Sequence, residues 1–267
     1  MKRARRPVLN AVIVLLALTS ASASEAAADD GLGPLGVTVV AAAGARSARV
    51  GALFPADRSA PLAGGHFCSA SVVHSPRRNL IVTAAHCLAG STGDLVFVPG
   101  YRDGRAPYGV WKVGKRYLPD GWAKGQDEDS DVAFAVVADQ GGKGVEEVVG
   151  GGNRFFPGMA TGATAVTVTG YPDTREVPIS CTNRPIAHSR TQQRIDCPDF
   201  SGGTSGSPWV DGTGDVVGIL GGHEEGGVTA DVSYSVVLGA EAAELYRDAA
   251  QPKAGWLRRI PGGKLLD

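Results

Sequence analysis

The sequence predicts an all-β fold, either a barrel or a sandwich, followed by one helix near the C-terminal end. Short runs of β-branched residues recur between glycine, proline, asparagine and aspartate residues, and this spacing is typical of antiparallel barrels and sandwiches. Glycine contributes 38 of the 267 residues, about twice its average share, as expected for a chain with many tight turns. This length can bury a substantial core in one large domain or two small ones.

Residues 1–23 have the composition of a secretory signal peptide. Basic residues precede Pro7, and residues 7–18 are apolar apart from Asn10. The apolar run is about twelve residues long, whereas a membrane-spanning helix needs about twenty, so a membrane anchor is the weaker alternative. Ala21-Ser22-Ala23 matches a signal cleavage site. We therefore expect a secreted, extracellular protein with no membrane attachment after signal removal.

Residues 24–46 are rich in alanine, glycine and aspartate and contain one short apolar run, residues 37–43. We interpret them as a possible propeptide or a flexible leader. Arg46 and Arg49 offer cleavage sites just before the first convincing strand, residues 50–54, and this favours a propeptide. The mass of the intact secreted protein distinguishes the two alternatives.

The later predicted strands fall into two groups, separated by a glycine-rich connector at residues 139–153. Residues 237–250 carry apolar residues on one helical face and predict a helix that closes the domain. Residues 251–267 show no clear periodicity and receive no predicted role. The predicted strands after the first are residues 68–74, 79–84, 94–98, 110–113, 132–137, 163–169 and 215–220.

Charge and cysteine content restrict the binding partners. The formal net charge is −1, so no general positive field would attract nucleic acid.

Export favours disulfides, and an even cysteine count without a Cys-x-x-Cys pair argues against a zinc site. Three pairings are possible. We predict the two local ones, Cys68 with Cys87 and Cys181 with Cys197, each worth about 3 kcal/mol by loop entropy.

Gly203-Thr204-Ser205-Gly206-Ser207-Pro208 is the first segment with catalytic potential. A serine hydroxyl is a poor nucleophile without a neighbouring base, and the oxyanion that it generates needs donors already aimed at it. Glycine permits unusual backbone angles and lets a substrate carbonyl approach the amides of Gly203 and Ser205. The alternative is an ordinary surface loop of glycine and serine.

His86 is the candidate base, because an apolar strand, residues 80–83, delivers it just before Cys87. The candidate carboxylate that orients it is Asp131, which lies where an acidic run passes into an apolar strand and is therefore expected to be buried against His86. Asp129 is the competing carboxylate, two residues further from the strand.

These motifs occur in one order along the chain. Together they resemble the chymotrypsin-like (trypsin-fold) serine proteases, especially the short secreted bacterial branch. The resemblance implies two packed six-stranded antiparallel β-barrels, with His86 and Asp131 on the first barrel, Ser205 on the second and a cleft between them. The segments that carry the resemblance are Phe67-Cys68-Ser69-Ala70-Ser71-Val72-Val73, Thr83-Ala84-Ala85-His86-Cys87, Asp131-Val132-Ala133-Phe134 and the Ser205 motif.

The resemblance covers about residues 50–250 and gives the expected domain organisation. We expect a protease domain at residues 47–250. Its parts are a first barrel at about 47–138, a second barrel at about 154–237 and a closing helix at about 237–250.

The resemblance is less informative about specificity. Asp199 stands where trypsin-like members keep an acidic residue, which would favour Arg or Lys substrates; the alternative is an exposed loop residue. Leu220, Gly221 and Gly222 end the strand that would bind the substrate backbone. Leu220 replaces the histidine of glutamate-specific relatives, so glutamate specificity is disfavoured. Thr204 replaces the aspartate of animal members, so activation by its ion pair with a new N-terminus is not expected.

The sequence as a whole predicts a secreted serine endopeptidase that acts on proteins or peptides through an acyl-enzyme. His86 acts as general base and then acid, Ser205 as nucleophile, Asp131 as orienting group, and the amides of Gly203 and Ser205 as the oxyanion hole. We expect no metal or organic cofactor, and the oligomeric state stays open. The alternatives are a catalytically silent binding protein on this fold and an α/β-hydrolase esterase, whose residue order does not match.

Overall fold

The computed structural model describes residues 34–58, 62–90 and 93–251. The predicted signal peptide and residues 252–267 of the tail lie outside the described residues. Among the helices of the described ranges, none is long and apolar enough to cross a membrane.

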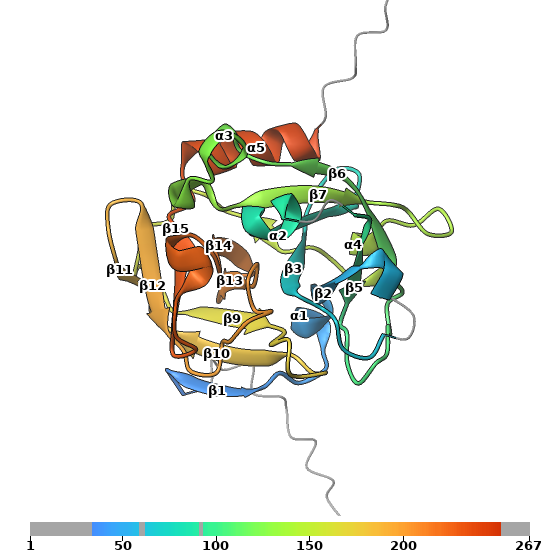
Figure 1. Cartoon of the computed structure of the whole chain (residues 1–267), viewed down its shortest axis with the longest axis horizontal. Coiled ribbons are helices and arrows are strands. Elements are labelled where there is room, and N and C mark those ends of the chain that lie inside the picture. The colour runs from blue at the N-terminus through green and yellow to red at the C-terminus, as the bar shows by residue number, and fades with distance from the viewer. Residues whose placement is uncertain (1–33, 59–61, 91–92, 252–267) are drawn as a thin grey trace, which may run out of the picture. The chain divides into compact units, whose positions relative to one another are not determined.

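The first half of the described chain forms a closed antiparallel barrel with the strand order β2-β3-β4-β7-β6-β5 (Figure 1). Residues with bulky side chains, among them Leu53, Phe97 and Trp111, are fully buried in its main core cluster. The predicted first barrel is therefore confirmed. Its strands are β2 (Val50–Pro55), β3 (Cys68–Val73), β4 (Leu80–Thr83), β5 (Leu95–Pro99), β6 (Trp111–Tyr117) and β7 (Ala133–Val137).

The strands of the second half, joined by the N-terminal strand β1, form two sheets instead of one closed six-stranded barrel. Their strands are β1 (Val37–Val40), β8 (Arg154–Phe155), β9 (Val166–Gly170), β10 (Ile179–Asn183), β11 (Ile186–Ala187), β12 (Gln192–Asp196), β13 (Pro208–Asp211), β14 (Asp215–Ile219) and β15 (Val232–Val236). One sheet has the order β1-β10-β9-β13-β14-β8, and the other has the order β11-β12-β15. The β14–β8 pair is parallel, a further departure from the predicted antiparallel barrel.

Side chains join the two sheets where the predicted barrel would close. The Oγ atom of Ser235 in β15 accepts the amide of Ile219 in β14 at 2.9 Å. The Nε2 atom of Gln193 in β12 donates to the carbonyl oxygen of Val217 at 3.3 Å. Together with the backbone bond from the Gly221 amide to the Tyr234 carbonyl oxygen at 2.9 Å, these side-chain bonds link the two sheets.

The helices connect and cover the sheets. The closing helix begins at Ala240, slightly later than predicted, because Gly239 is its N-cap residue and is extended. Tyr246 on this helix packs against Phe134 and Phe155, with ring centroids 5.6 and 5.2 Å away. The helices are α1 (Ala45–Ala48), α2 (Ala85–Ala89), α3 (Asp120–Gly125), α4 (Val145–Val148) and α5 (Ala240–Ala250), with 3-10 turns η1 (Ala56–Arg58), η2 (Glu128–Ser130) and η3 (His223–Gly226).

Both predicted local disulfides are present. Cys68–Cys87 joins β3 to α2, and Cys181–Cys197 joins β10 to the residue that follows β12. Each bond links a strand to a segment that leads toward a candidate catalytic residue.

Candidate active site

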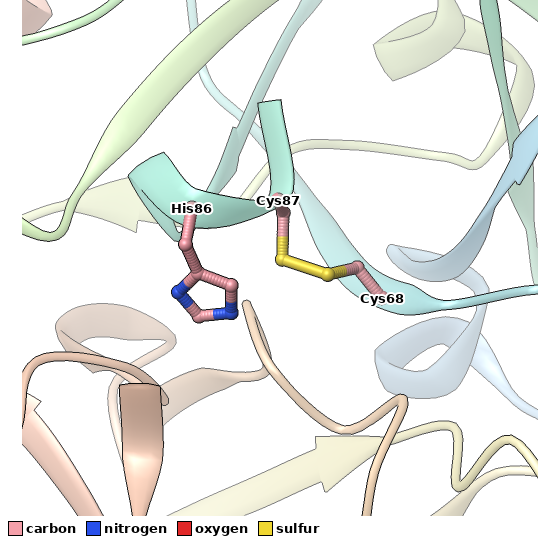
Figure 2. A group of neighbouring side chains, drawn as sticks. All are labelled: Cys68, His86 and Cys87. Atoms are coloured by element: carbon pink, nitrogen blue, oxygen red, sulfur yellow. A yellow bond between two sulfur atoms is a disulfide. The ribbon is translucent and has the colours of Figure 1, made fainter. Parts of the chain in front are cut away.

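The helix α2 holds His86 at the end of the buried strand β4. Every residue of β4 is buried, and the extended N-cap Ala84 turns the chain into the helix. Next to His86, Cys87 is covalently fixed to Cys68, and the imidazole projects from the helix beside this disulfide (Figure 2). The position of His86 is therefore set by strand burial and by a covalent bond.

Asp131 is fully buried and its carboxylate accepts three hydrogen bonds. Its Oδ2 atom lies 2.7 Å from Nδ1 of His86 and accepts the amide of Gly222 at 2.8 Å. Its Oδ1 atom accepts the amide of His86 at 2.9 Å. These donors compensate for the burial of the charge. An ionised carboxylate only accepts, so Nδ1 of His86 carries the proton and Nε2 is left as the basic nitrogen.

The competing carboxylate, Asp129, has a different role. It is exposed, and its Oδ1 atom accepts a hydrogen bond from Nε2 of Gln192 at 2.9 Å. The structure brings Asp131 to His86, whereas Asp129 binds the start of β12.

Two glycines shape the turn that carries Ser205. Gly203 has a φ angle of +87°, and a Cβ atom there would lie 2.5 Å from the amide nitrogen of Asp173. Gly206 has a φ angle of +84°, and its Cβ atom would lie 2.1 Å from the carbonyl oxygen of Ser69. Both positions need glycine for conformation and for space. The backbone of β3 also holds the turn directly, because the Ser69 amide donates to the Ser205 carbonyl oxygen at 2.7 Å.

The amides of Gly203 and Ser205 donate no hydrogen bond to any other group of the described residues. The Gly203 carbonyl oxygen, in contrast, accepts from Oγ of Ser69 at 3.1 Å. The loop is therefore fixed through its carbonyl groups and leaves these two amides free to bind an oxyanion.

His86 and Ser205 line the same groove, which has a volume of about 930 Å³. The groove brings together the imidazole from the first barrel and the hydroxyl from the second half of the fold. Glu225 in η3 also lines it, and its carbonyl oxygen lies 3.5 Å from Oγ of Ser205, a long contact for a hydroxyl donor.

The residues predicted for specificity have other surroundings. The Asp199 side chain is 59 % exposed and lies 3.5 Å from Arg175, which matches the exposed-loop alternative. Leu220 is buried in an apolar cluster of the second half. Gly221 and Gly222 lie against Asp131: a Cβ atom on Gly221 would be 2.6 Å from Oδ2, and Gly222 donates to the same atom. The sequence did not predict that these two glycines contact the Asp131 carboxylate.

Ser69 is a second missed contributor. It lies in the segment that resembles the protease family, but neither its residue type nor its place in an apolar strand signals a bond to the nucleophile loop. Only the packing of β3 against the second half reveals it.

Cys68, His86 and Cys87 place three potential metal-binding atoms within 4.8 Å of one another (Figure 2). The two sulfur atoms form a disulfide and provide no thiolate, which is the form that binds metal. This group therefore does not fit a metal ion.

Comparisons with known proteins agree with this geometry. A model of the trypsin-like peptidase domain matches residues 68–219. The glutamyl endopeptidase of Bacillus licheniformis is 30% identical over 138 residues, which are 48% of this chain and 41% of that protein. The match thus spans about two fifths of the length of this curated relative.

Solved protease structures have a similar fold. Protease Anisep from Arthrobacter nicotinovorans gives a TM-score of 0.65 at 28% identity, covering 76% of this chain and 95% of that chain. The thermostable serine protease AL20 from an extremophilic microorganism gives 0.66 at 28% identity, covering 78% and 99%. A Glu endopeptidase in complex with MPD gives 0.63 at 18% identity, covering 82% and 99%, and shows the fold alone. Because the family model matches more than half of the chain, this protein belongs to the trypsin-like peptidase family.

Proposed function

We propose that this protein is a secreted serine endopeptidase in which His86, Asp131 and Ser205 form the catalytic triad. The observation that carries the proposal is the 2.7 Å contact between buried Asp131 and Nδ1 of His86, whose ring shares a groove with Ser205. Asp131 fixes the tautomer of the ring and stabilises the imidazolium that forms during attack.

The proposed reaction proceeds through an acyl-enzyme. Nε2 of His86 takes the hydroxyl proton as Oγ of Ser205 attacks the carbonyl carbon of the scissile bond. The carbonyl π electrons move to oxygen, and the amides of Gly203 and Ser205 stabilise that oxyanion. When the oxyanion collapses, the carbon–nitrogen bond breaks and His86 returns its proton to the leaving amine. Water then attacks the ester by the same steps and releases Ser205.

The glutamate preference in the name of the Bacillus licheniformis relative does not carry over in this proposal. Leu220 is 3% exposed and packs in an apolar cluster, so it gives a substrate carboxylate no positive partner. We also infer a signal peptide at residues 1–23 and a protein or peptide substrate.

Replacement of the nucleophile tests the proposal. We expect Ser205→Ala to retain the fold and to lose peptide cleavage by several orders of magnitude. Ser180→Ala is the control, because its hydroxyl is also a partly buried serine hydroxyl but bonds Thr169 in the sheet and not the motif of Ser205.

A second measurement separates a protease from a silent binding protein. A fluorophosphonate should label the unaltered protein and Ser180→Ala at Ser205, as located by peptide mapping, and should not label Ser205→Ala. Undiminished peptide cleavage by Ser205→Ala would refute the nucleophile. A well-folded protein that neither cleaves a mixed peptide library nor reacts with the probe would support the binding protein.

A further inference from the structure

The N-terminal strand β1 is bonded to the loop that leads to Ser205. It pairs with β10 in antiparallel register, Val37 opposite Thr182 and Val40 opposite Ile179. From β1, Oγ1 of Thr38 donates to the carbonyl oxygen of Pro198 at 2.6 Å, a contact that joins positions 160 apart in the sequence. The strand thus reaches past β10 to the chain segment between β12 and the nucleophile.

Pro198 precedes a residue in a left-handed conformation. Asp199 has a φ angle of +71°, which costs a residue other than glycine about 1–2 kcal/mol. The carbonyl of Pro198 and the amide of Asp199 belong to the same peptide group. The hydrogen bond from Thr38 therefore fixes the peptide plane that enters this strained residue, whereas the exposed pair of Asp199 with Arg175 is worth little.

Other contacts hold the loop on either side of this peptide. Cys197 is bonded to Cys181 in β10, and its amide donates to Asp231. The amide of Phe200 donates to the carbonyl oxygen of Ala230, and its side chain is buried. The Pro198 carbonyl lies between these anchors. The hydrogen bond from Thr38 therefore restrains the part of the loop that neither Cys197 nor Phe200 restrains.

The loop continues without a break to the oxyanion site. The carbonyl oxygen of Ser201 accepts both the amide of Thr204 at 3.2 Å and its hydroxyl at 2.6 Å. This turn sets the directions of the Gly203 and Ser205 amides. A rotation of the peptide at position 198 would therefore be passed to the donors that stabilise the oxyanion.

We propose that β1 remains in the active protease and that Thr38 is a positioning residue for the loop at residues 198–205, which carries the amides of Gly203 and Ser205. This inference rests on the proposed function. It places the N-terminus of the mature chain before Gly36, whose amide donates to Thr182 at 2.8 Å, and not after Arg46 or Arg49. The described part of the predicted propeptide or leader, from residue 34 onward, then stays in the active enzyme.

The test uses the full-length secreted protein with Thr38→Val, which keeps the shape of the side chain and removes the donor. Thr38→Ser restores a hydroxyl. Thr167→Val is the matched control, because it removes a hydroxyl that bonds only Thr182 within the sheet, at 2.8 Å. Amide hydrogen exchange of Phe200, Ser201 and Thr204, whose amides are bonded, the rate of fluorophosphonate labelling, and kcat and KM are measured for each variant. Intact mass gives the N-terminus of the active form.

We expect Thr38→Val to accelerate exchange of the Phe200, Ser201 and Thr204 amides and to lower kcat and the labelling rate about three- to tenfold, the effect typical of one lost hydrogen bond. KM should not change, because oxyanion donors act in the transition state. Thr38→Ser should recover most of the loss, and Thr167→Val should match the unaltered protein.

Three results would overturn the inference. Exchange in Thr38→Val equal to that in Thr167→Val would show that the bond does not hold the loop. A rise in KM alone, or unchanged kinetics, would remove the positioning role. An active secreted form that begins after Arg46 would show that β1 is dispensable. The exchange comparison needs no activity, so it tests the role of Thr38 even in a protein that proves to be catalytically silent.

Discussion

The hydroxyl of Ser69 in β3 donates to the carbonyl oxygen of Gly203 at 3.1 Å. The Ser69 Oγ atom also accepts the amide of Tyr171 at 2.9 Å, and the Ser69 amide donates to the carbonyl oxygen of Ser205 at 2.7 Å. One residue of the first barrel therefore bonds the Ser205 loop on both sides of Thr204 and bonds Tyr171, which follows β9. This clamp holds Ser205 in a fixed relation to the barrel that carries His86.

Ser69→Ala should weaken both stability and catalysis. It leaves the Tyr171 amide and the Gly203 carbonyl without their buried partner, at a cost of about 1–3 kcal/mol in the free energy of unfolding. We expect kcat to fall, because the loop that carries the oxyanion donors loses one of its supports. Urea unfolding and peptide kinetics measure the two effects. Ser180→Ala is the control, since its Oγ makes a partly buried contact with Thr169; an equal loss of kcat there would argue against the clamp.

Gly206→Ala should disrupt the nucleophile turn. The new Cβ atom would lie 2.1 Å from both Ser69 O and Thr83 Oγ1, at a φ angle of +84°. Overpacking and backbone strain together cost at least about 2 kcal/mol, and a displacement of the neighbouring Ser205 by about 1 Å can lower kcat about a hundredfold. Gly212→Ala, where no atom lies within 4 Å, should be neutral in melting temperature and activity. Normal activity of Gly206→Ala would contradict the prediction, because it would show that the backbone of this turn can move enough to accommodate a Cβ atom.

The sequence was sufficient to predict the all-β class, the first barrel and both disulfides. The β class and the disulfides have local signals, namely recurring apolar runs and short loops between cysteines, whereas the barrel is implied only by the resemblance to a known family. The pairing of β1 with β10 has no such signal. A four-residue apolar run near a predicted cleavage site carries no information about its partner, which is decided by the free edge that β10 presents after folding. The links between the two sheets of the second half, made by Ser235 and Gln193, likewise join segments with no shared local pattern.

At the candidate site, the sequence favoured the carboxylate that the structure places beside the histidine. The change from polar to apolar residues at position 131 predicted burial, and Asp131 is fully buried. The specificity residues were harder to predict. Gly221 and Gly222 follow the expected strand, but Gly221 lies against the Asp131 carboxylate and the amide of Gly222 donates to it. A contact between segments so far apart in sequence has no local pattern.

Asp131→Asn should lower kcat by about four orders of magnitude while the protein still folds. The asparagine side chain has one acceptor and one donor, so its NH2 group would face either Nδ1 of His86 or the amide of Gly222 and favour the wrong tautomer. Asp129→Asn is the matched control, because its Oδ1 atom can still accept from Gln192. Kinetics and circular dichroism of both variants test this. A large loss in Asp129→Asn, with activity retained in Asp131→Asn, would reverse the assignment.

Asp215 gives a prediction for the pH dependence of stability. Hydrogen bonds from Arg154, at 2.6 Å through Nε, lower the pKa of the Asp215 carboxyl; its burial acts in the opposite direction. Because the pKa of this carboxyl is lower in the folded protein than in the unfolded chain, where it is about 3.9, the ionised group stabilises the fold above that unfolded pKa. This stabilisation is lost as the pH falls through the pKa of the folded protein. Arg154→Gln should therefore reduce the melting temperature at pH 7 and have little effect near pH 2.

The control is Lys124→Gln, which removes an exposed pair with Asp120 and should change the melting temperature at neither pH. An equal loss at both pH values would show that Arg154 acts through its contact with the Phe156 ring, 5.7 Å from the ring centroid, and not through its ion pair with Asp215.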